Sequence, residues 1–80
     1  MTPAQTVQLY ALIARHQFDM QGIVTGVTPA EIARAWQAKF GDRLPRGPMA
    51  KLSDARLIRR LPMHRPCAVA GVMRRPWVIA

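Results

Sequence analysis

The sequence predicts an α+β domain that is mainly helical, with three helices followed by a C-terminal β-hairpin. Two stretches, "TPAQ" at residues 2–5 and "TPAE" at residues 28–31, have the form of helix starts. A run with two prolines and two glycines at residues 41–48 must interrupt any helix. After Arg56 the helical spacing gives way to an alternation typical of strands. The chain has 80 residues, and we expect residues 1–80 to form one small domain.

The first helix is expected over residues 3–16. Thr2 can cap it, Pro3 suits the first helical position, and Gln5 completes a capping box. One face of this helix is built from residues at helical spacing, namely Leu9, Leu12, Ile13 and His16. We therefore expect that face to be packed in the core.

The second helix, over residues 29–40, has the clearest boundaries. Thr28 is the predicted N-cap, and Glu31 is expected to reach back to the Thr28 N–H. Gly41 is a suitable stop. Residues three or four apart form an apolar stripe, namely Ile32, Ala35, Trp36 and Phe40. Arg34 is the basic residue nearest its centre, and we interpret the helix as a scaffold that positions the segments after it.

The third helix is expected over residues 48–56, with Pro48 at its first position and Met49 and Leu52 facing inward. Strands are expected over residues 57–62 and 72–79, separated by a basic loop. Between the first two helices, a short extended run at residues 23–25 is bracketed by glycines.

The charge is strongly basic and unevenly placed. The net charge is +8, and ten of the twelve basic residues are arginine. Residues 1–40 hold three basic against two acidic residues, whereas residues 41–80 hold nine against two. This excess favours a polyanionic partner, such as DNA, RNA, an acidic protein or an acidic membrane surface, although charge also serves simply to keep a surface solvated.

The compartment predicted from the sequence is the cytoplasm. Cys67 is the only cysteine, so an intramolecular disulfide cannot form. The N-terminus lacks a basic segment followed by an apolar run, and we expect no signal peptide. No apolar run approaches the roughly 20 residues of a membrane span.

The order of these elements is helix, short extended piece, helix, turn, helix, strand, basic loop and strand. This order resembles that of the winged helix-turn-helix domains. "VTPAEIARAW" is similar to the first helix of the helix-turn-helix pair, and "GPMAKLSDARLIRRL" to the third helix running into the first wing strand. "MHRPCAVAG" would then be the wing. The resemblance covers residues 3–79 and implies a DNA-binding domain of the kind found in small bacterial, plasmid and phage regulators.

The resemblance implies contacts to double-stranded DNA from the turn before the third helix, from that helix and from the wing. The candidate residues are Arg43, Arg46, Lys51, Ser53, Arg60, His64, Arg65, Arg74 and Arg75. The start of the third helix is poor in hydrogen-bonding groups, which favours phosphate contact over the reading of bases. Alternatively, Arg43 and Arg46 are solvated turn residues, and either Arg59 or Arg60 pairs with Asp54. His64 and Arg65 would lie at the wing tip.

Catalysis is not expected. His16, His64 and Cys67 form no cluster with the spacing of metal ligands, and we expect no metal and no cofactor. Trp36 and Trp77 are interpreted as core residues, with stacking on single-stranded nucleic acid as the alternative.

The function expected is therefore a small DNA-binding regulator or accessory factor of a mobile element, in which a homodimer would span two half-sites. The alternative is a phage-type inhibitor or adaptor that binds a host protein with an acidic surface. Membrane contact by residues 68–80, which combine apolar residues with two arginines, is not expected because they show no amphipathic helical pattern.

Overall fold

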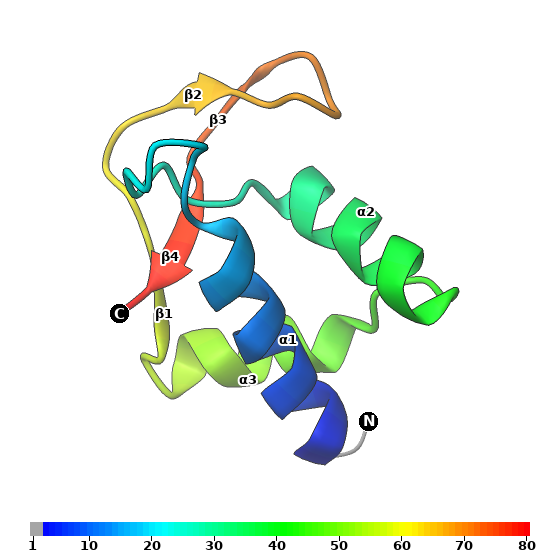
Figure 1. Cartoon of the computed structure of the whole chain (residues 1–80). Coiled ribbons are helices and arrows are strands. Elements are labelled where there is room, and N and C mark those ends of the chain that lie inside the picture. The colour runs from blue at the N-terminus through cyan, green and yellow to red at the C-terminus, as the bar shows by residue number, and fades with distance from the viewer. Residues whose placement is uncertain (1–2) are drawn as a thin grey trace.

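A computed structural model describes residues 3–80 of the chain. The elements in order are α1 (Pro3–His16), α2 (Pro29–Phe40), α3 (Arg46–Asp54), β1 (Ile58–Arg60), β2 (Arg65–Pro66), β3 (Met73–Arg74) and β4 (Trp77–Ile79). Three helices thus precede a small antiparallel β structure (Figure 1), and the predicted α+β, mainly helical class is confirmed. The predicted cap at Thr2 lies outside the described residues. No helix in the described range is long and apolar enough to cross a membrane.

The start of α2 has the predicted capping box. The Thr28 hydroxyl accepts a hydrogen bond from the Glu31 N–H at 3.4 Å, and a Glu31 carboxylate oxygen accepts one from the Thr28 N–H at 3.1 Å. Gly41 ends the helix in a left-handed conformation, with φ 78°, and donates its N–H to the Gln37 carbonyl. Both ends of α2 are therefore fixed by local hydrogen bonds that the sequence signals directly.

The core forms where α1 contacts α2, α3 and β4 (Figure 1). Its buried residues are Leu9, Leu12, Ile13, Val27, Ile32, Trp36, Leu52 and Ile58. Trp36 is buried with its ring 4.3 Å from that of Phe40, and Trp77 packs against the core while half-buried, so both tryptophans are core residues as expected. His16 was expected on the buried face but is exposed at the end of α1.

The third helix differs from the prediction at both ends. It begins at Arg46 and not at Pro48, and it ends at Asp54 and not at Arg56. Pro48 becomes the third helical residue, which is tolerated because the first N–H groups of a helix have no intrahelical partner. The helix ends where Arg56 adopts φ 58° and Leu57 donates its N–H to the Leu52 carbonyl. This is a left-handed stop of the kind that glycine usually provides.

The predicted strands at 57–62 and 72–79 form one hairpin but two separate ladders. β1 pairs with β4 in the register Ile58 to Ile79, and β2 pairs with β3 in the register Arg65 to Arg74. Between the ladders, residues 61–64 on one arm face only residues 75–76 on the other. The Leu61 N–H still donates to the Pro76 carbonyl there at 2.9 Å, but the unequal lengths of the two arms prevent one continuous register.

The extended piece before α2 joins the β structure. The N–H of Val27 donates to the Trp77 carbonyl, and the Trp77 N–H donates to the Val27 carbonyl, both at 2.8 Å. A second isolated bridge joins Phe18 to Val24 within the loop between α1 and α2. The loop is thereby attached to β4, and the position of the start of α2 is fixed relative to the hairpin.

Candidate nucleic-acid interface

Most of the basic residues have no carboxylate partner. Within residues 3–80 the single ion pair joins Arg65 to Glu31. The expected alternative pairing of Asp54 with Arg59 or Arg60 is not formed, and Asp54 and both arginines are exposed. Most of the positive charge of the chain is therefore not neutralised by carboxylates within residues 3–80 and can act on a partner.

Of the cationic candidates around α3, Arg43 lies in the turn before the helix, Arg46 is its first residue, and Lys51 lies in its last turn. Arg43, Arg46 and Lys51 are all exposed, and Ser53 is half-buried. Pro45 occupies the N-cap position of α3 and makes no side-chain hydrogen bond to the first turn. The start of this helix therefore presents side-chain charge without a competing side-chain cap.

A hollow of about 610 Å³ lies beside this turn, along the outer face of α2. It is lined by Ala30, Ala33, Arg34, Gln37, Arg43, Leu44 and Val69. Arg34 and Gln37 were not among the predicted site residues, because α2 was interpreted as a scaffold. The sequence holds a signal for them, since residues 30, 33, 34 and 37 have the spacing of one helical face. The small alanines allow close approach to the helix, while Arg34 and Arg43 supply charge.

The predicted basic residues of the hairpin lie away from this turn, although Val69 at the hairpin tip lines the hollow beside it. In Figure 1 the β2–β3 hairpin is at one end of the molecule and α3 is at the other. His64, Arg74 and Arg75 are exposed there. Arg75 donates its Nε–H to the Leu61 carbonyl at 2.9 Å, and the Arg60 guanidinium lies 4.9 Å from the centre of the Trp77 ring. The structure therefore does not gather the predicted residues into one continuous surface.

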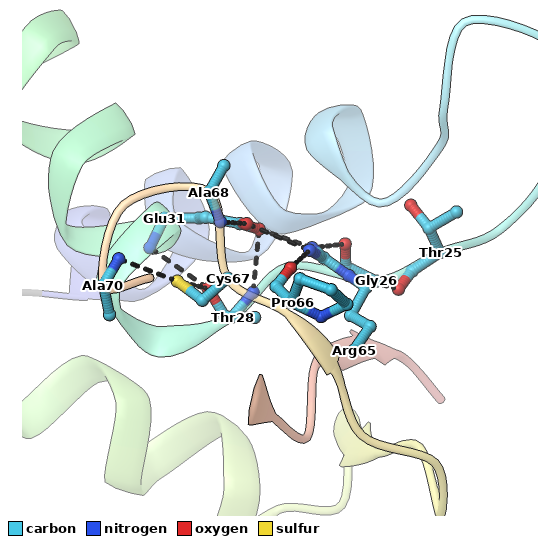
Figure 2. A network of polar contacts seen from close by, with 9 residues as sticks. All are labelled: Thr25, Gly26, Thr28, Glu31, Arg65, Pro66, Cys67, Ala68 and Ala70. Carbon is cyan, nitrogen blue, oxygen red and sulfur yellow. Dashed lines mark hydrogen bonds and ion pairs between the residues drawn. The ribbon is translucent and has the colours of Figure 1, made fainter. Parts of the chain in front are cut away.

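Arg65 has a different position from the one expected. It lies on β2, whereas the turn at the hairpin tip is formed by residues after Cys67, with the Gly71 N–H donating to the Cys67 carbonyl. Its guanidinium donates to both carboxylate oxygens of Glu31, at 2.5 and 3.0 Å, and to the carbonyls of Thr25, Gly26 and Pro66 (Figure 2). With its donors engaged in this way, Arg65 is a structural residue, and the expectation that it is free at a wing tip was wrong.

The hairpin tip is docked on the first turn of α2. The Cys67 thiol lies 2.9 Å from the Thr28 hydroxyl, and the Ala70 N–H donates to the Cys67 sulfur at 3.3 Å (Figure 2). The hydrogen bond with Thr28 is the main reason that the pKa of the Cys67 thiol is lowered. The Ala68 N–H donates to Glu31 at 3.1 Å. Residues that the resemblance assigns to the wing are thus held against the helix that lines the hollow.

The Glu31 carboxylate is the centre of this contact. Burial by itself raises its pKa, but hydrogen bonds from Arg65 and from the N–H groups of Thr28 and Ala68 outweigh burial. The pKa of Glu31 is therefore held below its ordinary value, and the group is ionised near neutral pH. Because its charge is matched by Arg65, it does not oppose an anion at the nearby hollow.

Within the described part of the chain, no group of three or more His, Cys, Asp or Glu side chains is placed to hold a metal ion. Comparisons with protein families, with curated proteins and with solved structures find no match to this chain.

Proposed function

We propose that the chain binds double-stranded DNA through the hollow beside α2, the turn before α3 and the start of α3. The observation that carries the proposal is the placement of Arg34 and Arg43 around one hollow, together with Gln37, while neither arginine has a carboxylate partner within residues 3–80. The two guanidinium groups and the amide can donate hydrogen bonds to the phosphates of a DNA backbone. The alanines that also line the hollow leave room for that backbone to approach.

The arrangement of elements supports a winged-helix type of domain. Within the extended piece predicted at residues 23–25, Val24 forms a bridge with Phe18; Val27, just after it, bridges Trp77, and the hairpin follows α3 directly. In this proposal the exposed hairpin arginines add electrostatic attraction to the DNA phosphates. Arg65 adds none, because its charge is paired with that of Glu31. Sequence discrimination would be modest, since α3 begins with few hydrogen-bonding side chains.

We place the activity in the cytoplasm, in a small regulator or accessory factor of a mobile element, with no catalytic step. The basic composition supports this class. Two copies on adjacent half-sites would provide a longer site than one copy of this size can contact.

Fluorescence anisotropy against a labelled DNA duplex over a range of salt concentrations tests the proposal. The double variant Arg34→Gln, Arg43→Gln should bind more weakly, and the slope of log K against log salt should decrease by about one for each phosphate that is no longer neutralised. The matched control is Arg15→Gln, Arg59→Gln, which removes the same charge from exposed residues that do not line the hollow. Equal losses in both double variants would contradict the assigned site, and absence of binding at about 50 mM salt would contradict DNA binding itself.

A further inference from the structure

The end of the hairpin forms a small unit of its own, and we call residues 65–74 the flap. β2 and β3 pair within it. The Cys67 N–H donates to the Val72 carbonyl, and the Gly71 N–H donates to the Cys67 carbonyl, both at 2.9 Å. Gly71 has φ 71°, a left-handed conformation that glycine adopts without steric cost. The flap therefore keeps its shape through hydrogen bonds that lie inside residues 65–74.

The connection between the flap and the rest of the β structure carries few hydrogen bonds. Residues 61–64 and 75–76 separate the flap ladder from that of β1 and β4, and across them the Leu61 N–H donates to the Pro76 carbonyl. Among residues 65–74, Cys67 is the one buried residue, and none of them belongs to the hydrophobic core around α1. Because the core does not hold the flap, it can move at little cost in apolar burial, with this connection as the hinge.

Polar contacts hold the flap on the first turn of α2 (Figure 2). The Cys67 thiol lies 2.9 Å from the Thr28 hydroxyl. The Glu31 carboxylate accepts a hydrogen bond from the Ala68 N–H at 3.1 Å and two from the Arg65 guanidinium. The docked position of the flap therefore depends on the side chains of Thr28, Glu31 and Arg65.

The docked flap forms one wall of the hollow beside α2. Val69 is 41% exposed and lines the hollow together with Arg34 and Arg43. Neither arginine has a carboxylate partner within residues 3–80, and docking keeps the charge of Glu31 matched by Arg65. Charges of one sign between walls of low dielectric constant produce a stronger field than the same charges in open water. Docking therefore favours an anion in the hollow both by placing Val69 there and by neutralising Glu31.

We propose that the flap is a hinged wall of the phosphate site, and that Glu31 and Arg65 are positioning residues that hold it in the state that binds DNA. The inference rests on the proposed function for the identity of the ligand. Among residues 65–74, Val69 alone lines the hollow, so the flap borders the hollow and does not cover it. Opening of the flap removes this wall and leaves Glu31 unmatched. The affinity for DNA then falls in proportion to the fraction of chains in which the flap is docked.

The double variant Glu31→Gln, Arg65→Gln tests the inference, because it removes both ends of the ion pair and leaves the net charge unchanged. Glutamine at position 31 can still accept from the Thr28 N–H, so the start of α2 is retained. Its affinity for a labelled DNA duplex should fall about threefold or more, with an unchanged slope of log K against log salt. The control Asp54→Asn, Arg59→Gln makes the same charge changes at exposed residues that do not line the hollow. Equal affinities of the two double variants would overturn the inference.

A covalent lock of the flap provides the converse test. Thr28→Cys places a second thiol beside Cys67, and because the side-chain atoms at these positions are 2.9 Å apart, oxidation should form an intramolecular disulfide. Added to Glu31→Gln, Arg65→Gln, the oxidised lock should restore the affinity to within about twofold of the unchanged chain, and reduction should remove the gain. Circular dichroism confirms that both forms are folded when they are compared.

Three results with the lock would overturn the inference. No gain in affinity on oxidation would show that docking of the flap does not set DNA binding. Weaker binding by the oxidised than by the reduced form of the single variant Thr28→Cys would show that the docked flap covers the site. Absence of the disulfide in mass spectrometry would show that the flap is not docked on α2.

Two single variants keep the inference testable if Glu31→Gln, Arg65→Gln does not fold. Val69→Glu places a negative charge in the wall of the hollow and should weaken DNA binding about tenfold. Val72→Glu makes the same change at a flap residue that is 46% exposed and does not line the hollow, and it should weaken binding by less than about threefold. Equal losses would show that the flap does not place Val69 at the site.

A measurement without DNA separates this inference from the proposed function. Absence of DNA binding by the unchanged chain at about 50 mM salt would contradict the proposed function. In ¹⁵N spectra of the free chain that carries the lock together with Glu31→Gln, Arg65→Gln, oxidation should return the amides of Arg43 and Leu44, across the hollow from the flap, to their positions in the unchanged chain. Amides of Arg43 and Leu44 that do not respond to oxidation would show that the flap is not a wall of the hollow.

Discussion

Arg65 on β2 donates hydrogen bonds from both terminal nitrogens of its guanidinium to the carboxylate of Glu31. Glu31 lies on the first turn of α2, 34 residues earlier in the chain. The same guanidinium also donates to the carbonyls of Thr25 and Gly26, just before α2. One side chain therefore joins the hairpin, the loop and the helix. The planar fork of arginine suits this task because it offers several donors in fixed directions.

Replacing Arg65 with lysine should destabilise the fold although the charge is kept. A single ammonium group cannot serve the Glu31 carboxylate and the loop carbonyls together, so partly buried acceptors are left without donors. We expect a loss of about 1–3 kcal/mol in the free energy of unfolding, measured by urea denaturation. Arg59→Lys is the control, since Arg59 is exposed, and should change it by less than about 0.5 kcal/mol. A result for Arg65→Lys within the range of this control would show that the contact does not stabilise the fold.

The Glu31 carboxylate should make stability depend on acid pH. Its pKa in the folded chain lies below its ordinary value of 4.5, so the unfolded chain takes up a proton first as the pH falls. The stabilising effect of the carboxylate is complete well above pH 4.5 and is lost as the pH falls through the folded pKa. Urea denaturation at a series of pH values should therefore show a steeper acid loss in the unchanged chain than in Glu31→Gln. Asp42→Asn, at an exposed carboxylate, should retain the steep loss; the same flattening in both variants would argue against a special role for Glu31.

The parts of the fold that the sequence predicts well are those with local causes. The bounds of α1 and α2 are as predicted, because proline, capping residues and glycine act on backbone groups only a few positions away. The start of α3 was misplaced because two prolines, at 45 and 48, both suit a helix start. Local sequence does not decide between them.

The features that depend on distant contacts were missed. Nothing near Arg65 in the sequence distinguishes it from an exposed arginine, because its partner lies in another element. Arg34 became a site candidate only when the turn holding Arg43 was placed beside α2. The division of the hairpin into two ladders depends on how its unequal arms are paired, which no alternation of residue types reveals. Topology, more than residue type, therefore determines the candidate site.

Cys67 should report whether the hairpin tip is docked. The residue is 2% exposed, so its thiol should react slowly with an alkylating reagent even though its hydrogen bond with Thr28 lowers its pKa. Reaction requires the tip to leave α2, and the rate should follow that opening. Mass spectrometry should show alkylation about tenfold or more slower in the folded chain than in urea, and faster in Arg65→Lys than in Arg59→Lys. Equal rates in folded and unfolded chains would show that the tip is not held.

Gly26 should be the glycine least tolerant of a side chain. Gly22 and Gly26 both have left-handed backbones, with φ 80° and 76°, so alanine at either position carries a conformational cost of about 1 kcal/mol. They differ in their surroundings: a Cβ at Gly26 would lie 2.6 Å from the Pro76 Cβ and 3.0 Å from the Trp77 carbonyl oxygen, whereas one at Gly22 would meet nothing within 4 Å. The clash falls where the loop before α2 meets β4, and backbone atoms there cannot move without breaking the Val27–Trp77 bridge. We expect Gly26→Ala to lower the free energy of unfolding by about 2–4 kcal/mol, and Gly22→Ala by about 1 kcal/mol. Urea denaturation measures both variants, and the difference between their free energies of unfolding cancels the backbone cost that they share. Equal losses in the free energy of unfolding would mean that the loop and β4 are not in close contact in solution.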